Sequence, residues 1–267
     1  MPGKRSVKKM GLEGLRTMSA IAAIALVAYG VACAALFLLQ RSLIYFPQPR
    51  SAVAGASILT LPVDGADVVI TVRERSGPSA LVYFGGNAED VSQSLAPLAA
   101  AFPDHALYLM HYRGYGGSSG APSETALVAD ALRLFDRAQA QHANIVVIGR
   151  SLGSGVAIQL ASARPAERLV LITPYDSLQD LAARQFPYMP VRWLLRDKFE
   201  SGTFAARITA PTLLIAAEND EVIPRSSTDA LHARFAAGVA SLRVVSGTGH
   251  NTISSVPEYT ALLRADK

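Results

Sequence analysis

Between residues 66 and 265, short apolar runs alternate with longer stretches whose apolar residues have helical spacing. The apolar runs cover residues 66–75, 79–86, 105–113, 144–149, 168–173, 211–217 and 241–247. The helical stretches cover residues 88–102, 123–141, 152–164, 226–238 and 255–265. Apolar strands that alternate with helices are typical of a parallel sheet buried on both faces. The sequence therefore predicts an α/β protein with a mostly parallel central sheet covered by helices on both faces.

One segment, residues 176–206, interrupts this alternation. Its aromatic residues are Phe186, Tyr188, Trp193 and Phe199. In sheets of this kind the functional site lies at the carboxyl ends of the strands, where an inserted segment can cover it. We predict a short lid at about residues 176–206. The alternative is that these aromatic side chains simply pack on the sheet.

The N-terminal part of the chain differs in character. Residues 18–39 contain no charge and would form a helix about 33 Å long, enough to cross a bilayer. Residues 1–16 hold five basic residues and one acidic residue, so the net charge of this segment equals the formal net charge of the whole chain, +4. Because basic residues favour the cytoplasmic side, we predict a single-pass anchor in the cytoplasmic membrane, with the N-terminus inside. The alternatives are a cleaved signal peptide and a lipidated Cys33, but apolar residues continue after Cys33.

These patterns divide the chain into four segments. We expect a basic cytoplasmic tail at 1–17, a transmembrane signal-anchor helix at 18–39, a connector at 40–56 and an extracytoplasmic α/β domain at 57–267. Beyond residue 16 the charges balance, so the basic surface that nucleic-acid binding needs is not expected. Cys33 is the only cysteine, which excludes an internal disulfide and a thiolate metal site.

Ser151 lies where the apolar run 144–149 meets the helical stretch 152–164, within the letters GRSLGSG. This is the context of a G-x-S-x-G elbow, a turn that strains the serine backbone and exposes its hydroxyl. Only glycine fits such a turn at positions 149 and 153, and the helix N-terminus favours a developing negative charge. We therefore predict that Ser151 is a catalytic nucleophile.

A serine nucleophile needs a base, and the base needs an acid. Of the five histidines, His250 follows the last strand, in a loop that can return over the carboxyl edge of the sheet. Asp220, three residues past the run 211–217, is the preferred acid. Glu218 is the fallback, and Glu221 is expected to face solvent. Ser151, Asp220 and His250 then stand in the order that proteins with this elbow require.

The negative charge that forms on an attacked carbonyl oxygen needs two hydrogen-bond donors. One is expected to be the backbone N–H of Leu152, directly after the nucleophile. The other is expected to be the backbone N–H of Asn87, in the loop FGGNAED after the run 79–86. Gly85 and Gly86 would allow this loop to approach a substrate closely.

With these residues in place, the chain resembles the α/β-hydrolase superfamily over about residues 40–265. The resemblance is carried by FGGNAED, HYRGYGGSSGAPSE, GRSLGSG, APTLLIAAENDEVIP and GTGHN. It is most similar to membrane-anchored serine hydrolases, a branch that includes uncharacterised bacterial proteins and the eukaryotic α/β-hydrolase-domain proteins. The chain departs from that branch at Gly85, where histidine is usual, and at His111, where aspartate or asparagine is usual.

The resemblance implies an α/β-hydrolase fold and hydrolysis of a carboxylic ester, thioester or amide through an acyl-serine intermediate, without cofactor or metal. Some relatives remove fatty acyl groups from proteins, and others act as peptidases or lipases. We expect a carboxylesterase or thioesterase with a small-molecule or lipid-like acyl substrate or an acylated protein, and no nucleic-acid partner. The alternatives are a serine exopeptidase or amidase, and a non-catalytic binding protein on the same fold.

Overall fold

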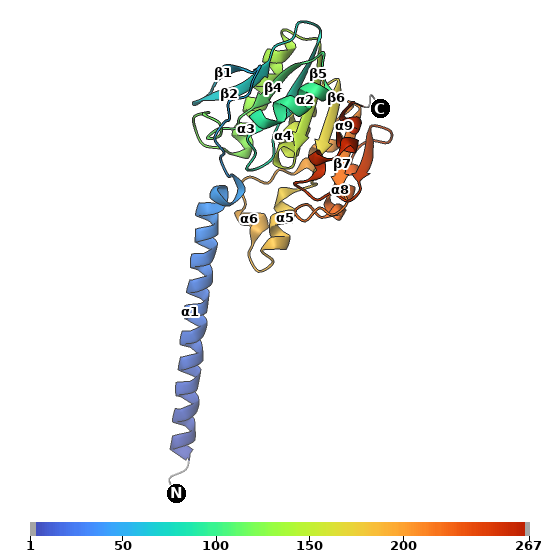
Figure 1. Ribbon diagram of the computed structural model, residues 1–267. Coiled ribbons are helices and arrows are strands. Elements are labelled where there is room, and N and C mark those ends of the chain that lie inside the picture. The colour runs from blue at the N-terminus through green and yellow to red at the C-terminus, as the bar shows by residue number, and fades with distance from the viewer. Residues whose placement is uncertain (1–3, 265–267) are drawn as a thin grey trace.

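The computed structural model describes residues 4–264, with side chains from residue 14 onward. Residues 1–3 of the predicted tail and residues 265–267 of the predicted α/β domain lie outside the described residues. The centre of the domain is an eight-stranded sheet of order β1-β2-β4-β3-β5-β6-β7-β8 (Figure 1). In chain order the strands are β1 (Ser57–Val63), β2 (Ala66–Arg73), β3 (Ser79–Phe84), β4 (Ala106–Met110), β5 (Asn144–Arg150), β6 (Arg168–Ile172), β7 (Thr212–Ala217) and β8 (Ala240–Val245).

The sheet is parallel except at one edge. β3 pairs in parallel with β4 and β5, and each strand from β5 to β8 pairs in parallel with the next. β2 runs antiparallel to both β1 and β4. The predicted mostly parallel sheet is confirmed. β1 is missing from the predicted runs because its side chains face mainly solvent, and only Leu61 of its seven residues is buried.

Helices cover both faces of the sheet, as predicted. Buried residues of α3, α4, α7 and α8 belong to one hydrophobic cluster, and those of α2 and α9 belong to a second cluster on the other face. Helix α3 begins after Ser123, whose Oγ accepts a hydrogen bond from the N–H of Ala126. The helices of the domain are α2 (Leu95–Ala101), α3 (Glu124–Gln139), α4 (Leu152–Ala161), α5 (Leu178–Gln185), α6 (Val191–Leu194), α7 (Ser201–Ala205), α8 (Arg225–His232) and α9 (Pro257–Arg264).

Side chains along the inner strands alternate between the two clusters. In β3, Ala80, Val82 and Phe84 face the first cluster, whereas Leu81 and Tyr83 face the second. All five are at most 2% exposed. Burial of each large apolar side chain contributes about 1.5–3 kcal/mol to stability. This core holds the strands so that the loops after β3, β5, β7 and β8 leave the sheet at the same edge.

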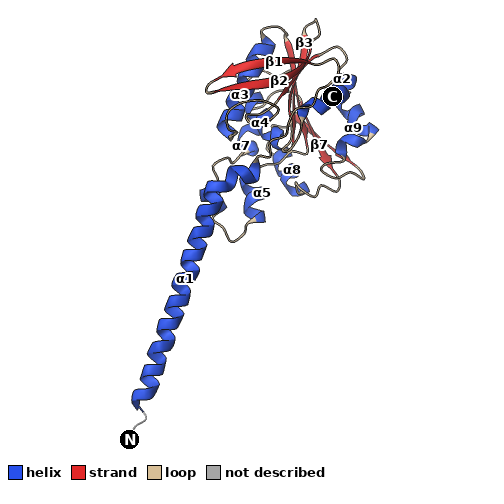
Figure 2. Cartoon of the chain, turned by 60° about the vertical axis from the view of Figure 1, so that its left-hand side comes forward, coloured by secondary structure: helices blue, strands red, loops and turns tan. Residues whose placement is uncertain are grey.

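Helix α1 (Lys4–Ile44) projects from the domain as a single rod of 41 residues (Figures 1 and 2). Among the described residues, Gly14–Ile44 is the one helical segment long and apolar enough to cross a membrane. Ile24 and Leu38 illustrate its surface, since they are 69% and 76% exposed. The predicted span 18–39 falls inside this helix.

The segment 176–206, which interrupts the alternation of strands and helices in the sequence, contains the helices α5, α6 and α7. Helices α5 and α6, with the loop between them, form a hairpin (residues 178–195, the α5–α6 hairpin) beside the C-terminal end of α1 (Figure 1). Tyr188 and Trp193 of this hairpin are 87% and 88% exposed. Phe199 is instead fully buried and packs near Gly155 of α4. Packing in the core therefore accounts for Phe199 but not for Tyr188 or Trp193.

Candidate active site

Ser151 occupies a strained turn between β5 and α4. Its φ is 49° and its ψ is −116°, a backbone conformation that side-chain-bearing residues rarely adopt. A Cβ atom on Gly149 would come within 2.6 Å of the Cβ of Ala157, and one on Gly153 would overlap the carbonyl oxygen of Phe84. Both glycines are therefore required by the close packing of α4 against β5 and β3. The turn leaves the Ser151 side chain at the carboxyl edge of the sheet.

The three predicted triad residues form one continuous hydrogen-bonded chain. The Oγ of Ser151 lies 2.9 Å from Nε2 of His250, and Nδ1 of His250 lies 3.0 Å and 2.9 Å from the two carboxylate oxygens of Asp220. Asp220 follows β7, and His250 lies in the loop after β8 (residues 246–252, the histidine loop). Both side chains are buried, at 6% and 7% exposure. The fold thus brings together residues up to 99 positions apart in the chain.

Asp220 is held in its ionised form. Burial opposes the negative charge, but the hydrogen bond with His250 and those from the backbone N–H groups of Ile223 and Val222 outweigh it. The pKa of Asp220 therefore lies below its ordinary value. A carboxylate beside Nδ1 favours the tautomer in which Nδ1 carries the proton and Nε2 is free to accept one from Ser151.

The two neighbouring glutamates brace the histidine loop. Glu218 accepts a hydrogen bond from the N–H of Gly247 at 2.8 Å, so it is not the partner of the His250 ring. Glu221 is exposed, as expected, but its Oε2 also accepts a hydrogen bond from the N–H of His250 at 3.0 Å. The acidic run after β7 therefore fixes both the ring and the backbone of His250.

Asn87 and Leu152 lie beside Ser151. Their backbone N–H groups are the two expected oxyanion donors. Both residues line the same cavity as Ser151. Within residues 4–264, neither of their backbone N–H groups has a hydrogen-bond partner, which leaves both available to a ligand. The N–H of Gly86 is already used, because it donates to Glu89 at 2.7 Å.

Glu89 supports the loop that carries Asn87 (residues 85–90, the oxyanion loop), and the sequence analysis did not single it out. Its carboxylate accepts hydrogen bonds from the Tyr83 hydroxyl, the Ser94 hydroxyl and the Gly86 N–H, each 2.7 Å long. The usual histidine of the branch would require Val91 to move, because a Cβ at position 85 would overlap the Val91 side chain. The partly buried carboxylate of Glu89 thus holds the loop in this chain.

Arg150 connects the oxyanion loop with the histidine loop. Its guanidinium lies 3.5 Å from the carboxylate of Glu89 and 3.5 Å from the carbonyl oxygen of His250. Burial disfavours the charge of Arg150, but the nearby Tyr83 and Glu89 outweigh this and raise its pKa. The residue before Ser151 therefore carries a fixed positive charge between the two loops.

Three of the other four histidines have hydrogen-bond partners within the domain. His111 is buried, its Nε2 lies 2.8 Å from the Thr71 hydroxyl, and burial lowers its pKa to about 4. His142 contacts the Tyr108 hydroxyl, and His232 contacts a backbone carbonyl oxygen. The described residues contain no group of three or more His, Cys, Asp or Glu side chains that could hold a metal ion.

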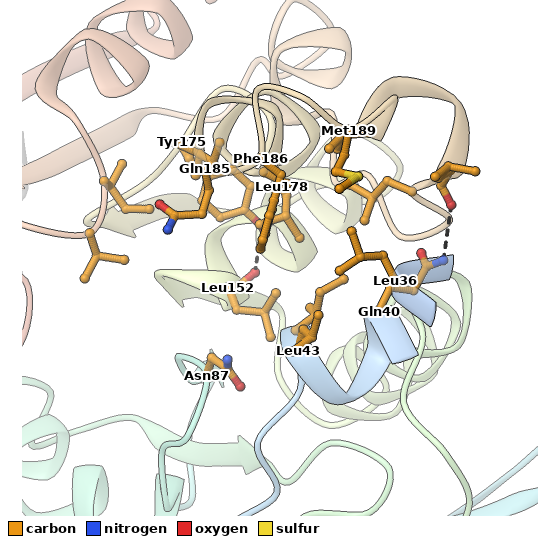
Figure 3. Close-up of a pocket in the computed structure, with 18 of the residues that line it drawn as sticks. Leu36, Gln40, Leu43, Asn87, Leu152, Tyr175, Leu178, Gln185, Phe186 and Met189 are labelled. Atoms are coloured by element: carbon orange, nitrogen blue, oxygen red, sulfur yellow. Dashed lines mark hydrogen bonds between the residues drawn. The ribbon is translucent and has the colours of Figure 1, made fainter. Parts of the chain in front are cut away.

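A cavity of about 410 Å³ opens at Ser151, between α1 and the α5–α6 hairpin (Figure 3). None of its lining residues is charged. Cavities of this size and character are typical of sites for small apolar ligands. The lining residues are Asn87, Ser151 and Leu152 from the catalytic loops, Leu36, Gln40, Leu43 and Ile44 from α1, Leu178, Leu181, Ala182, Gln185, Phe186, Met189, Val191, Leu194 and Leu195 from the hairpin, and Tyr175, Val222 and Ile223.

The comparisons with known sequences point to one family. A family model described as alpha/beta hydrolase fold matches residues 80–203. A protein of Mycobacterium tuberculosis described as uncharacterised is 37% identical over 262 residues, which cover 91% of each chain. Alpha/beta hydrolase domain-containing protein 17B of Homo sapiens is 31% identical over 199 residues, which cover 71% of this chain and 67% of that protein.

Solved structures with the same fold include two esterases. Est1E from Butyrivibrio proteoclasticus, solved with ferulic acid bound, matches with a TM-score of 0.65 and 14% identity, over 77% of this chain and 96% of that one. The esterase Pf2001 from Pyrococcus furiosus matches with a TM-score of 0.67 and 15% identity, over 82% and 96%. At these identities the likeness concerns the fold.

Proposed function

Because this chain belongs to the α/β-hydrolase superfamily, we propose that it is a membrane-anchored serine hydrolase that cleaves carboxylic esters or thioesters. The observation that carries the proposal is the hydrogen-bonded chain from Asp220 through His250 to Ser151, which ends at the floor of an uncharged cavity. A binding protein on the same fold would have no need of this arrangement or of the strain at Ser151.

In the proposed reaction, Ser151 forms and then loses an acyl group. Its Oγ attacks the substrate carbonyl carbon while its proton passes to Nε2 of His250, and Asp220 stabilises the resulting imidazolium. The backbone N–H groups of Leu152 and Asn87 donate to the oxyanion of the tetrahedral intermediate. When the intermediate collapses, the protonated His250 gives its proton to the leaving alcohol or thiol, and the acyl group stays on Ser151.

The second half of the reaction repeats these steps with water. His250 takes a proton from a water molecule, whose oxygen attacks the acyl carbon, and the same N–H groups again stabilise the oxyanion. Collapse breaks the bond to the Ser151 oxygen, which recovers its proton from His250. The carboxylic acid leaves, and every group returns to its starting state.

The cavity favours an ester or thioester over a peptide. An exopeptidase must hold a free terminal ammonium or carboxylate, and a buried charge needs a charged or strongly polar partner. The polar side chains of the lining are those of Gln40, Asn87, Ser151, Tyr175 and Gln185, all uncharged. An apolar acyl group fits this lining better.

The test is covalent labelling with a fluorophosphonate probe, which reacts with activated serines. The wild-type protein in detergent should be labelled, and Ser151→Ala should not. Ser162→Ala, the same substitution at the far end of α4, should be labelled like the wild type. A folded wild-type protein that resists the probe would sink the proposal, as would equal labelling of Ser151→Ala.

A further inference from the structure

We propose that α1 is part of the substrate site as well as an anchor, and that the substrate is a membrane-resident amphiphile whose long acyl chain reaches Ser151 from the bilayer between α1 and the α5–α6 hairpin. The inference rests on the proposed function and names its substrate class. Part of the cavity wall is formed by α1, the helix proposed to span the membrane (Figure 3).

One face of α1 lines the cavity. Leu36, Gln40 and Leu43 are spaced four and three residues apart, so they project from the same side of the helix. In Figure 3 they lie across the cavity from Phe186 and Met189 of the hairpin. Ser151 lines the same cavity. An apolar passage thus leads from the nucleophile to a helix suited to hydrocarbon.

Polar contacts fix α1 to the hairpin at the domain end of this passage. Gln40, which is 7% exposed, donates a hydrogen bond to the carbonyl oxygen of Leu194 at 3.1 Å and accepts one from the N–H of Arg196 at 2.7 Å. Arg41 pairs with the buried carboxylate of Asp197 at 3.0 Å. Gln40 and Asp197 are buried, whereas the Arg41 side chain is 44% exposed, and together these contacts give the wall made by α1 a defined position rather than that of a loose tether.

The hairpin also follows α1 into the predicted span. The Tyr29 hydroxyl donates to the carbonyl oxygen of Tyr188 at 2.9 Å, and the sulfur atoms of Cys33 and Met189 lie 3.9 Å apart. From Gln40 to Tyr29 the helix rises about 16 Å. That is about half the thickness of the hydrocarbon core. With α1 across the membrane, the tip of the hairpin and the outer end of the cavity therefore lie within the outer leaflet.

The outer surface of the hairpin fits this location. Phe186, Tyr188 and Trp193 are 40%, 87% and 88% exposed, and Arg184 and Arg192 are exposed on the same hairpin. Exposed aromatic side chains are compatible with a lipid environment, and the charge of Arg192 is paired with that of Asp180 at 2.8 Å. In water this apolar surface would be unfavourable, whereas lipid acyl chains would cover it. The mouth of the cavity thus opens among the acyl chains of the lipids.

The first experiment measures chain-length preference in proteoliposomes that contain the full chain. Leu36→Trp narrows the passage from the α1 side, and Leu38→Trp is the matched control, because Leu38 is 76% exposed and does not line the cavity. The readout is the ratio of kcat/KM for p-nitrophenyl palmitate to that for p-nitrophenyl butyrate. We expect Leu36→Trp to lower this ratio about tenfold or more, and Leu38→Trp to keep the wild-type ratio.

The possible outcomes distinguish the proposed route of the acyl chain from the proposed hydrolase activity. An enzyme that hydrolyses butyrate but has the same ratio in Leu36→Trp as in the wild type contradicts the route and leaves the proposed function standing. A wild-type protein that hydrolyses neither ester and resists the fluorophosphonate probe contradicts the proposed function, and the inference falls with it.

The second experiment locates the hairpin without reference to activity. Trp193 is the only tryptophan of the chain, so its fluorescence reports on the hairpin alone. In vesicles, lipids brominated on their acyl chains should quench this emission, and aqueous iodide should quench it weakly. The control is Ser76→Trp in a Trp193→Phe background, because Ser76 is exposed before the amino end of β3 and should show the opposite pattern. Strong iodide quenching of Trp193 without lipid quenching would overturn the inference.

Discussion

Among single residues, Glu89 has the most to do with the shape of the oxyanion loop. The loop would place the N–H of Asn87 correctly only if the carboxylate keeps its contacts with Tyr83, Ser94 and Gly86. Glu89 touches no substrate atom in the proposed reaction, so it is a positioning residue. Its loss should therefore affect the transition state, where the oxyanion forms, more than substrate binding.

Glu89→Gln tests this role with a side chain of the same size. The amide has one acceptor oxygen in place of two and loses the charge that faces Arg150. We expect kcat for a short-chain ester to fall about 100-fold, with little change in KM, because removal of one oxyanion donor has an effect of that order. Glu258→Gln, on the exposed surface of α9, should keep the wild-type kcat. A wild-type kcat for Glu89→Gln would contradict the role.

The sequence indicates those candidate site residues whose positions follow a strand. Ser151, Asp220 and His250 each follow a strand of the parallel sheet, so their meeting at one edge could be predicted. Glu89 and Arg150 could not be found in this way. Their contact joins the loop after β3 to the last residue of the neighbouring strand β5, and no periodic pattern in the sequence indicates such a partner.

Among the elements, the β5–α4 elbow has the least room for change. The backbone of Gly153 lies against the carbonyl oxygens of Phe84 and Gly85, so α4 touches the end of β3 directly. That contact sets the distance between Ser151 and the oxyanion loop. A side chain at position 153 must push the two elements apart.

Gly153→Ala should therefore affect stability and activity together. We expect the free energy of unfolding to fall by about 1–3 kcal/mol, the usual effect of overpacking, and labelling by the fluorophosphonate probe to slow. The measurements are a urea titration followed by circular dichroism in detergent and the rate of labelling. Gly30→Ala in α1 is the control, since no atom lies within 4 Å of the added Cβ and neither measurement should change. Unaltered stability of Gly153→Ala would show that the elbow is looser than its packing indicates.

Elements packed in the domain core and the long apolar helix were predictable from the sequence, whereas β1 and the helices of the α5–α6 hairpin were not. The inner strands alternate between two apolar clusters, which produces the continuous apolar runs of the sequence. β1 lacks such a run because it is an edge strand with one buried residue. The α5–α6 hairpin was predicted as part of a short lid at about residues 176–206, but its helices were not predicted, because its aromatic residues do not follow the pattern of a helix packed on a sheet.

For the whole molecule, the proposed topology places residue 267 outside the cytoplasm. The reason is the concentration of positive charge before the span, with five basic residues in 1–16. Alkaline phosphatase, which is active only outside the cytoplasm, should be active when fused after residue 267. A green fluorescent protein matured in the cytoplasm should be dark at the same position. The reverse pattern would contradict the orientation and place the hairpin in the inner leaflet.

The junction between α1 and the hairpin has a practical consequence for anyone who wishes to purify the enzyme. Cutting the chain after Ile44 to obtain a detergent-free protein would leave Asp197, which is 3% exposed, without Arg41. The Tyr45 hydroxyl would still donate a hydrogen bond to this carboxylate, but the loss of its charged partner would be destabilising. The cut would also open the cavity on the side where Leu36 and Leu43 stand. Activity profiles measured on such a truncated protein would describe a different catalyst from the full-length chain.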